Sequence, residues 1–132
     1  MKHGSLRHAE SYLVQAQGLD VENRNIANEV GYLKMKRAVV ESETSKSKEM
    51  FEEAFKRVEE LIAIQRDENV YPYHVLGSQT IAWTERSDVL SDHKRELYEK
   101  GLKYVEQGLE RYPSNSRLLE LKKEYFALLV SE

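Results

Sequence analysis

Cysteine is absent from the sequence, and only six glycines and two prolines occur among its 132 residues. Without cysteine the chain has no disulfide, no thiolate nucleophile and no zinc site with thiolate ligands. The shortage of glycine and proline argues against a turn-rich β-sandwich and favours long helices. No apolar run approaches the roughly 20 residues of a membrane span, and the first residues lack the apolar stretch of a secretory signal. We therefore expect a cytoplasmic protein.

Charge gives no sign of a nucleic-acid partner. The chain has 20 basic and 23 acidic residues and a formal net charge of −3, whereas nucleic-acid binding requires a clustered basic excess. The strongest basic run covers residues 34–37. On a helix these side chains point in several directions, with Glu29 and Glu41 nearby, so we interpret the run as a solvated face rather than a phosphate site.

Catalytic and metal-binding patterns are also missing. The four histidines lack the spacing of a zinc protease, and no phosphate-binding or nucleophile-elbow glycine motif occurs. The Glu-Glu pairs at 52–53 and 59–60 lie three or four positions from basic residues, which is typical of surface ion pairs on a helix. We expect no enzyme activity, no metal and no cofactor.

Apolar residues recur at steps of three and four along most of the chain, which predicts amphipathic helices and no strand. Polar residues 41–47 and 87–92 are predicted connectors, and a serine in the first connector is expected to cap the helix that follows. Pro72 fits the first turn of a helix. The predicted helices, about six in all, cover residues 6–19, 25–40, 48–65, 73–83, 97–109 and 118–129.

An internal repeat accompanies these helices. Asn23, Asn69 and Asn115 are spaced 46 residues apart, and so are Gly31 and Gly77. Each asparagine lies between two predicted helices, so the repeating unit is a pair of helices. The helical period continues through the glycines, and we therefore expect each of them to allow a close helix crossing. Gly77 in particular is predicted to lie at such a crossing.

These repeats resemble the tetratricopeptide repeat (TPR), a pair of antiparallel helices. Three segments carry the resemblance: Tyr73-x2-Leu76-Gly77-x2-Thr80, Gly101-x3-Val105-x2-Gly108-x4-Pro113 and Ala9-x3-Leu13-x2-Ala16. The resemblance implies an all-α fold, a right-handed solenoid of antiparallel helix pairs. The repeat of 46 residues exceeds the usual 34, and the additional residues fall near 38–50 and 84–96, where they lengthen the helices and add a connector.

The resemblance also implies how the chain is organised. Residues 6–132 are expected to form a single TPR-like domain that begins with the second helix of a pair, as in a fragment of a longer protein. Residues 1–5 are then a cloning scar or a disordered start. A small protein with a divergent cap is the alternative. A truncated array leaves its end helices uncovered, which predicts pairing of two copies through Leu6, Leu13, Val14, Leu118, Leu121 and Leu129.

The first helices of TPR pairs line an inner groove, so the glycine alignment predicts the partner-binding residues. These are Asn28, Tyr32, Tyr71 and His74; the rival interpretation is that Tyr32 packs beneath the next repeat. The basic clamp for acidic chaperone C-termini has no counterpart here. We therefore expect a protein-interaction module that binds a peptide or another domain of its parent chain. The alternative is a structural spacer or self-association unit.

Overall fold

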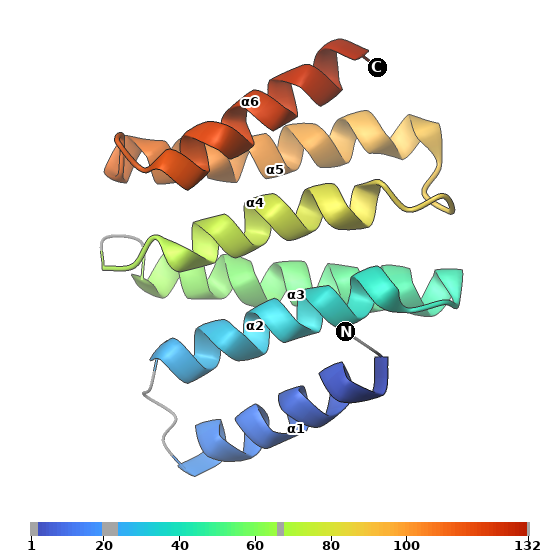
Figure 1. Cartoon of the computed structure of the whole chain (residues 1–132), viewed down its shortest axis with the longest axis vertical. Coiled ribbons are helices and arrows are strands. Elements are labelled where there is room, and N and C mark those ends of the chain that lie inside the picture. Colours follow the sequence, from blue (N-terminus) through green and yellow to red (C-terminus); the bar gives the residue numbers. More distant parts are fainter. Residues whose placement is uncertain (1–2, 20–23, 66–67, 132) are drawn as a thin grey trace. The chain divides into compact units, whose positions relative to one another are not determined.

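A computed structural model describes residues 3–19, 24–65 and 68–131. In these ranges every regular element is a helix and no strand occurs, which confirms the predicted all-α class (Figure 1). None of the described helices combines the length and the apolarity needed to cross a membrane. The six helices are α1 (His3–Leu19), α2 (Arg24–Val40), α3 (Thr44–Gln65), α4 (Tyr71–Thr84), α5 (Ser91–Arg111) and α6 (Ser116–Ser131).

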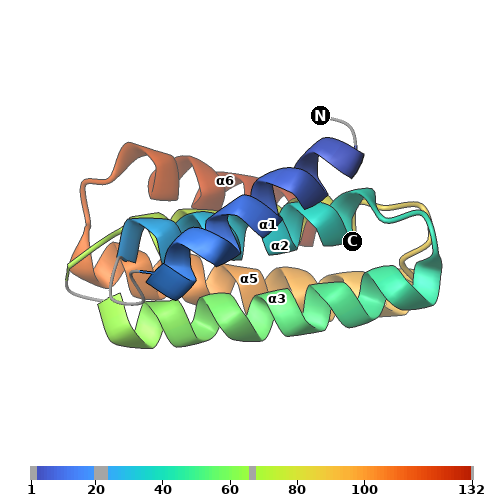
Figure 2. The same cartoon turned by 90° about the horizontal axis from the view of Figure 1, so that it is seen from below.

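The chain divides into two compact units, an N-terminal unit of Met1–Leu61 and a C-terminal unit of Ile62–Glu132, and the boundary falls within the last turns of α3. In the N-terminal unit α1 packs against α2, and the chain reverses direction from α1 to α2 and again from α2 to α3 (Figure 2). Gly31 brings the α2 backbone close to α3, because a Cβ there would lie 3.1 Å from Leu61 and 3.3 Å from Val58. Val58 and Leu61 are both buried.

The connector between α2 and α3 is shorter than the seven polar residues 41–47 predicted. Helix α3 begins at Thr44, within the predicted connector over 41–47. The expected serine cap is wrong, because Glu43 precedes the first residue of the helix. Ser47 lies inside the helix, and its hydroxyl donates to the carbonyl oxygen of Ala38 at 2.6 Å. This buried hydrogen bond joins the start of α3 to the end of α2. Polar residues here form a helical turn because one of them has an acceptor on the neighbouring helix.

In the C-terminal unit α5 packs against both α4 and α6, and α4 also contacts α6. The predicted crossing at Gly77 is confirmed: a Cβ there would lie 2.8 Å from Val105 of α5 and 3.2 Å from Leu121 of α6. The core contains a bulky aromatic residue, Tyr125, whose hydroxyl donates to the carbonyl oxygen of Gly77 at 2.5 Å. Glycine at position 77 therefore lets both neighbouring helices approach one backbone.

The asparagines of the repeat lie where helices begin. Asn69 accepts a hydrogen bond from the backbone N–H of Tyr71 at 3.0 Å, and Asn115 accepts one from that of Leu118 at 3.0 Å. Both side chains thus satisfy backbone donors that the first turn of a helix leaves free. Asn23 lies outside the described residues. The additional length of the repeat falls mainly in α3 and α5, which have 22 and 21 residues.

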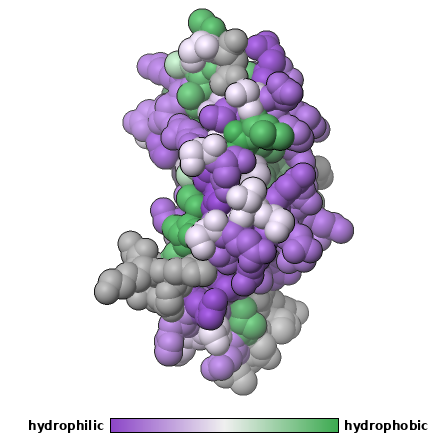
Figure 3. All heavy atoms as spheres, turned by 90° about the vertical axis from the view of Figure 1, so that its right-hand side faces the viewer, coloured by the Kyte–Doolittle hydropathy of each residue, from purple (hydrophilic) through white to green (hydrophobic). Residues whose placement is uncertain are grey.

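The prediction of uncovered apolar ends is wrong for the residues that carried most of it. Leu6 is 1 % exposed, and Leu118 and Leu121 are fully buried. Helix α6 instead exposes Leu119, Phe126 and Val130, which lie on its other side. Val14 is exposed and Leu129 is half-buried, as predicted, and the side chain of Leu13 lies outside the described part of the structure. On the face seen in Figure 3, hydrophilic surface predominates and hydrophobic residues form separate patches.

Candidate binding groove

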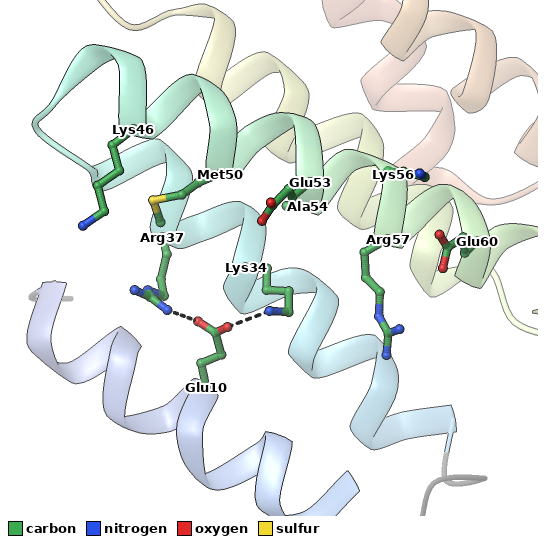
Figure 4. A pocket seen from close by; sticks show the side chains of 10 residues that line it. All are labelled: Glu10, Lys34, Arg37, Lys46, Met50, Glu53, Ala54, Lys56, Arg57 and Glu60. Atoms are coloured by element: carbon green, nitrogen blue, oxygen red, sulfur yellow. Dashed lines mark hydrogen bonds and ion pairs between the residues drawn. The ribbon is translucent and has the colours of Figure 1, made fainter. Parts of the chain in front are cut away.

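A groove of about 460 Å³ opens in the N-terminal unit between residues of α1, α2 and α3 (Figure 4). Five of its lining side chains are cationic and three are acidic, with only a methionine and an alanine between them. Charged groups therefore dominate the lining by number, while the aliphatic stems of these side chains, together with the methionine and the alanine, supply apolar surface. The lining residues are Glu10, Lys34, Arg37, Lys46, Met50, Glu53, Ala54, Lys56, Arg57 and Glu60.

Glu10 joins α1 to α2 at one wall of the groove. Its carboxylate accepts hydrogen bonds from Lys34 at 3.0 Å and from Arg37 at 2.5 Å, and Figure 4 shows the carboxylate between the two cations. The Glu10 side chain is 9 % exposed, against 40 % for Lys34 and 20 % for Arg37. A carboxylate this buried requires such partners, since an unpaired buried charge is strongly destabilising.

The local environment changes the acidity of Glu10. Burial raises the pKa of its carboxyl. The hydrogen bonds from Arg37 and Lys34, together with their positive charges, lower this pKa by more than burial raises it. The net result is a pKa below the usual value. Glu10 is thus ionised throughout the neutral range and holds Lys34 and Arg37 in place along the groove.

Replacing Glu10 with glutamine is expected to lower the free energy of unfolding by about 2 kcal/mol at neutral pH, because two charge-assisted hydrogen bonds weaken. Since the folded pKa is depressed, the stabilisation is present above the unfolded value of about 4.3 and is lost as the pH falls through the folded value. Urea unfolding at neutral and strongly acidic pH measures the difference. Glu49→Gln, on the exposed side of α3, is the control. An equal loss at both pH values would contradict the ion-pair explanation.

Arg57 contrasts with the paired cations of the opposite wall. Its side chain extends from α3 into the groove (Figure 4), and its Nε is buried without a hydrogen-bond partner. Among the described residues it forms no ion pair either. A buried donor that finds no acceptor costs about 1–3 kcal/mol. The Nε of Arg37 also lacks a hydrogen-bond partner, but Arg37 pairs with Glu10 through another guanidinium nitrogen, so Arg57 is the groove arginine without an ion pair among the described residues.

The four residues predicted to bind a partner do not line this groove. Asn28 and Tyr32 lie one turn apart on α2; Asn28 is 4 % exposed and Tyr32 is half-buried. Tyr71 and His74 lie on α4 in the C-terminal unit and are both half-buried. The structure thus brings the residues together as two pairs, one in each unit. Their role in binding stays a prediction.

His74 also has a structural contact. Its Nε2 lies 2.9 Å from Oδ1 of Asn115, the same oxygen that accepts from the first turn of α6. The imidazole therefore ties the start of α4 to the turn between α5 and α6. Any loss of binding on substitution of His74 must be compared with the loss of this contact.

Sequence reasoning missed Glu10 and Arg57, and it interpreted residues 34–37 as a solvated face. One signal was available: the basic run lies on the helix that follows Glu10, with a spacing of 24 residues to Lys34.

The described residues contain no group of three or more histidine, aspartate or glutamate side chains that could hold a metal ion. Comparisons with protein-family models, with curated proteins and with solved structures find no match to this chain.

Proposed function

We propose that this chain is a protein-interaction module that binds a segment of a partner polypeptide in the groove of its N-terminal unit. The observation that carries the proposal is the groove itself, which three helices line with charged side chains, among them an arginine with no acceptor. An open groove of about 460 Å³ has room for several side chains of a partner. Its lining combines many charged groups with apolar surface, a mixture that is typical of surfaces that recognise a polypeptide.

The proposal includes a TPR-like architecture in which the helix pairs continue as a right-handed solenoid. Its support is the repeat of 46 residues. Gly31 and Gly77 both lie at close helix contacts, and the side chains of Asn69 and Asn115 both accept hydrogen bonds from backbone N–H groups at the start of a helix. A cytoplasmic location, a protein or peptide partner and the absence of catalysis, of cofactors and of nucleic-acid binding belong to the same proposal.

Selection of peptides from a displayed random library on the intact protein tests this function. We expect a set of peptides that compete with one another and that lose at least about tenfold in affinity when Met50, at the groove, is changed to glutamate. Lys123→Glu on α6, which does not line the groove, is the control and is expected to bind normally. Circular dichroism confirms that each variant remains folded.

Tyr32→Ala separates the groove from the surface predicted by the glycine alignment. If the selected peptides require Tyr32 but tolerate Met50→Glu, binding occurs at the predicted surface instead. If Tyr32→Ala lowers stability by several kcal/mol, this tyrosine belongs to the core. A library that yields no competing peptides would favour the alternative function, a spacer or self-association unit. Light scattering over a dilution series would then show a homodimer that dissociates.

A further inference from the structure

The face of α3 that lines the groove carries charges in a regular order. Lys46, Met50, Glu53, Arg57 and Glu60 follow one another at intervals of four, three, four and three residues. This spacing keeps all five on one side of the helix, at the period of roughly 3.5 residues with which one helix contacts another along its length. Along the central part of the stripe the charges alternate from negative to positive to negative.

The three central charges have no ion-pair partner in the described part of the chain. Glu53 and Arg57 are four residues apart, and Arg57 and Glu60 are three apart, which are favourable spacings for ion pairs within a helix. Among the described residues, however, none of the three forms an ion pair or a side-chain hydrogen bond. The Arg57 guanidinium extends into the groove instead of lying along α3 (Figure 4). The alternating charges therefore remain free for an external partner.

The other ionic positions of the groove are largely satisfied. Glu10 pairs with Lys34 and Arg37, and Lys46 lies 3.6 Å from the carboxylate of Glu41. The groove charges that have no partner among the described residues therefore lie mainly on α3, at Glu53, Arg57 and Glu60. The exposed Lys56 lies beside them. A purely acidic segment would be attracted by Arg57 but repelled by the two glutamates that flank it.

We propose that the groove recognises a helical segment of a partner protein in which an acidic residue is flanked, one helical turn on either side, by basic residues. The acidic side chain would pair with Arg57, and the basic ones with Glu53 and Glu60. Since the order basic–acidic–basic is the same in both chain directions, the pattern fits a parallel or an antiparallel helix. This inference rests on the proposed function and specifies the chemistry of its partner.

Two designed peptides test the charge pattern. Both are alanine-rich, acetylated and amidated helices; one contains Lys-Ala-Ala-Ala-Glu-Ala-Ala-Ala-Lys and the other has every charge reversed. Fluorescence anisotropy at low ionic strength is expected to show binding of the first peptide that is at least about tenfold tighter, because a charge-assisted pair replaces a like-charge contact. Adding salt should reduce the difference. Equal binding of the two peptides would overturn the inference.

A charge-reversed groove provides the decisive variant. In Glu53→Arg/Arg57→Glu/Glu60→Arg the preference between the two peptides is expected to invert, while circular dichroism shows an unchanged helix content. Arg95→Glu/Glu99→Arg reverses an exposed ion pair of α5 and should leave the preference unchanged. A preference that survives the groove reversal, or binding of neither peptide, would overturn the inference. Library peptides that depend on Met50 but ignore this reversal would sustain the proposed function alone.

Discussion

Replacing Gly101 with alanine is expected to lower the free energy of unfolding by about 3 kcal/mol, although alanine is the better helix former. A Cβ at this position would lie 2.1 Å from the hydroxyl oxygen of Tyr125 and 2.6 Å from the ring carbon that carries it. The ring is rigid, fully buried and held by its hydrogen bond to Gly77. It has no space into which to move, so α5 and α6 must separate.

Gly31→Ala is the matched control for this prediction. A Cβ there would meet only the ends of two aliphatic side chains, Leu61 at 3.1 Å and Val58 at 3.3 Å. These side-chain ends can shift by a few tenths of an ångström. The higher helix propensity of alanine, about 1 kcal/mol, offsets the energetic cost of that shift. Urea unfolding followed by circular dichroism compares the two variants. Equal midpoints would show that the α5–α6 crossing tolerates a methyl group.

Tyr125→Ala is expected to cost about 3–5 kcal/mol, because it removes an aromatic ring from the centre of the C-terminal unit. The ring is fully buried and stands at 77° to the ring of Tyr98, with the centroids 6.3 Å apart. Burial also raises the pKa of its hydroxyl above the usual value, so it remains a donor to Gly77 over the whole physiological range.

Tyr125→Phe separates the ring from the hydroxyl and is expected to cost only about 1 kcal/mol, the net value of one hydrogen bond. Tyr12→Ala, at a residue that is 70 % exposed, serves as the control and should leave stability unchanged. Fluorescence of the buried Trp83, the single tryptophan, reports unfolding of the C-terminal unit. A loss for Tyr125→Phe as large as that for Tyr125→Ala would show that the hydroxyl, not the ring, dominates.

The helices were predictable because local periodicity determines them. Five of the six begin and end within a few residues of the predicted positions, but α5 begins at Ser91, several residues before Leu97. The error at 41–47 has a different origin. Serine and threonine favour turns when their hydroxyls bond locally, but Ser47 bonds to Ala38 on another helix. No local pattern contains that acceptor, so only the packed structure reveals it.

The choice between apolar faces could not be made from the sequence. Helix α6 has leucines at both 118 and 119, and the apolar residues of either side fit a helical stripe. The structure buries Leu118 and Leu121 and exposes Leu119. Two glycines of α5 decide this, because a Leu118 methyl group and the Tyr125 ring fill the space that Gly108 and Gly101 leave open.

The sequence by itself determined the helical class, the repeat of 46 residues and the glycines at which helices cross, since the helical period is local and the spacing of the repeated residues is visible in the sequence itself. The tertiary structure alone decided which charges meet. Glu10 pairs with Lys34 and Arg37 from a different helix, whereas Arg57 finds no ion-pair partner among the described residues, although Glu53 and Glu60 are its neighbours on the same helix. Ion pairs form between atoms that the packing brings within a few ångströms, and sequence spacing does not specify that distance across helices.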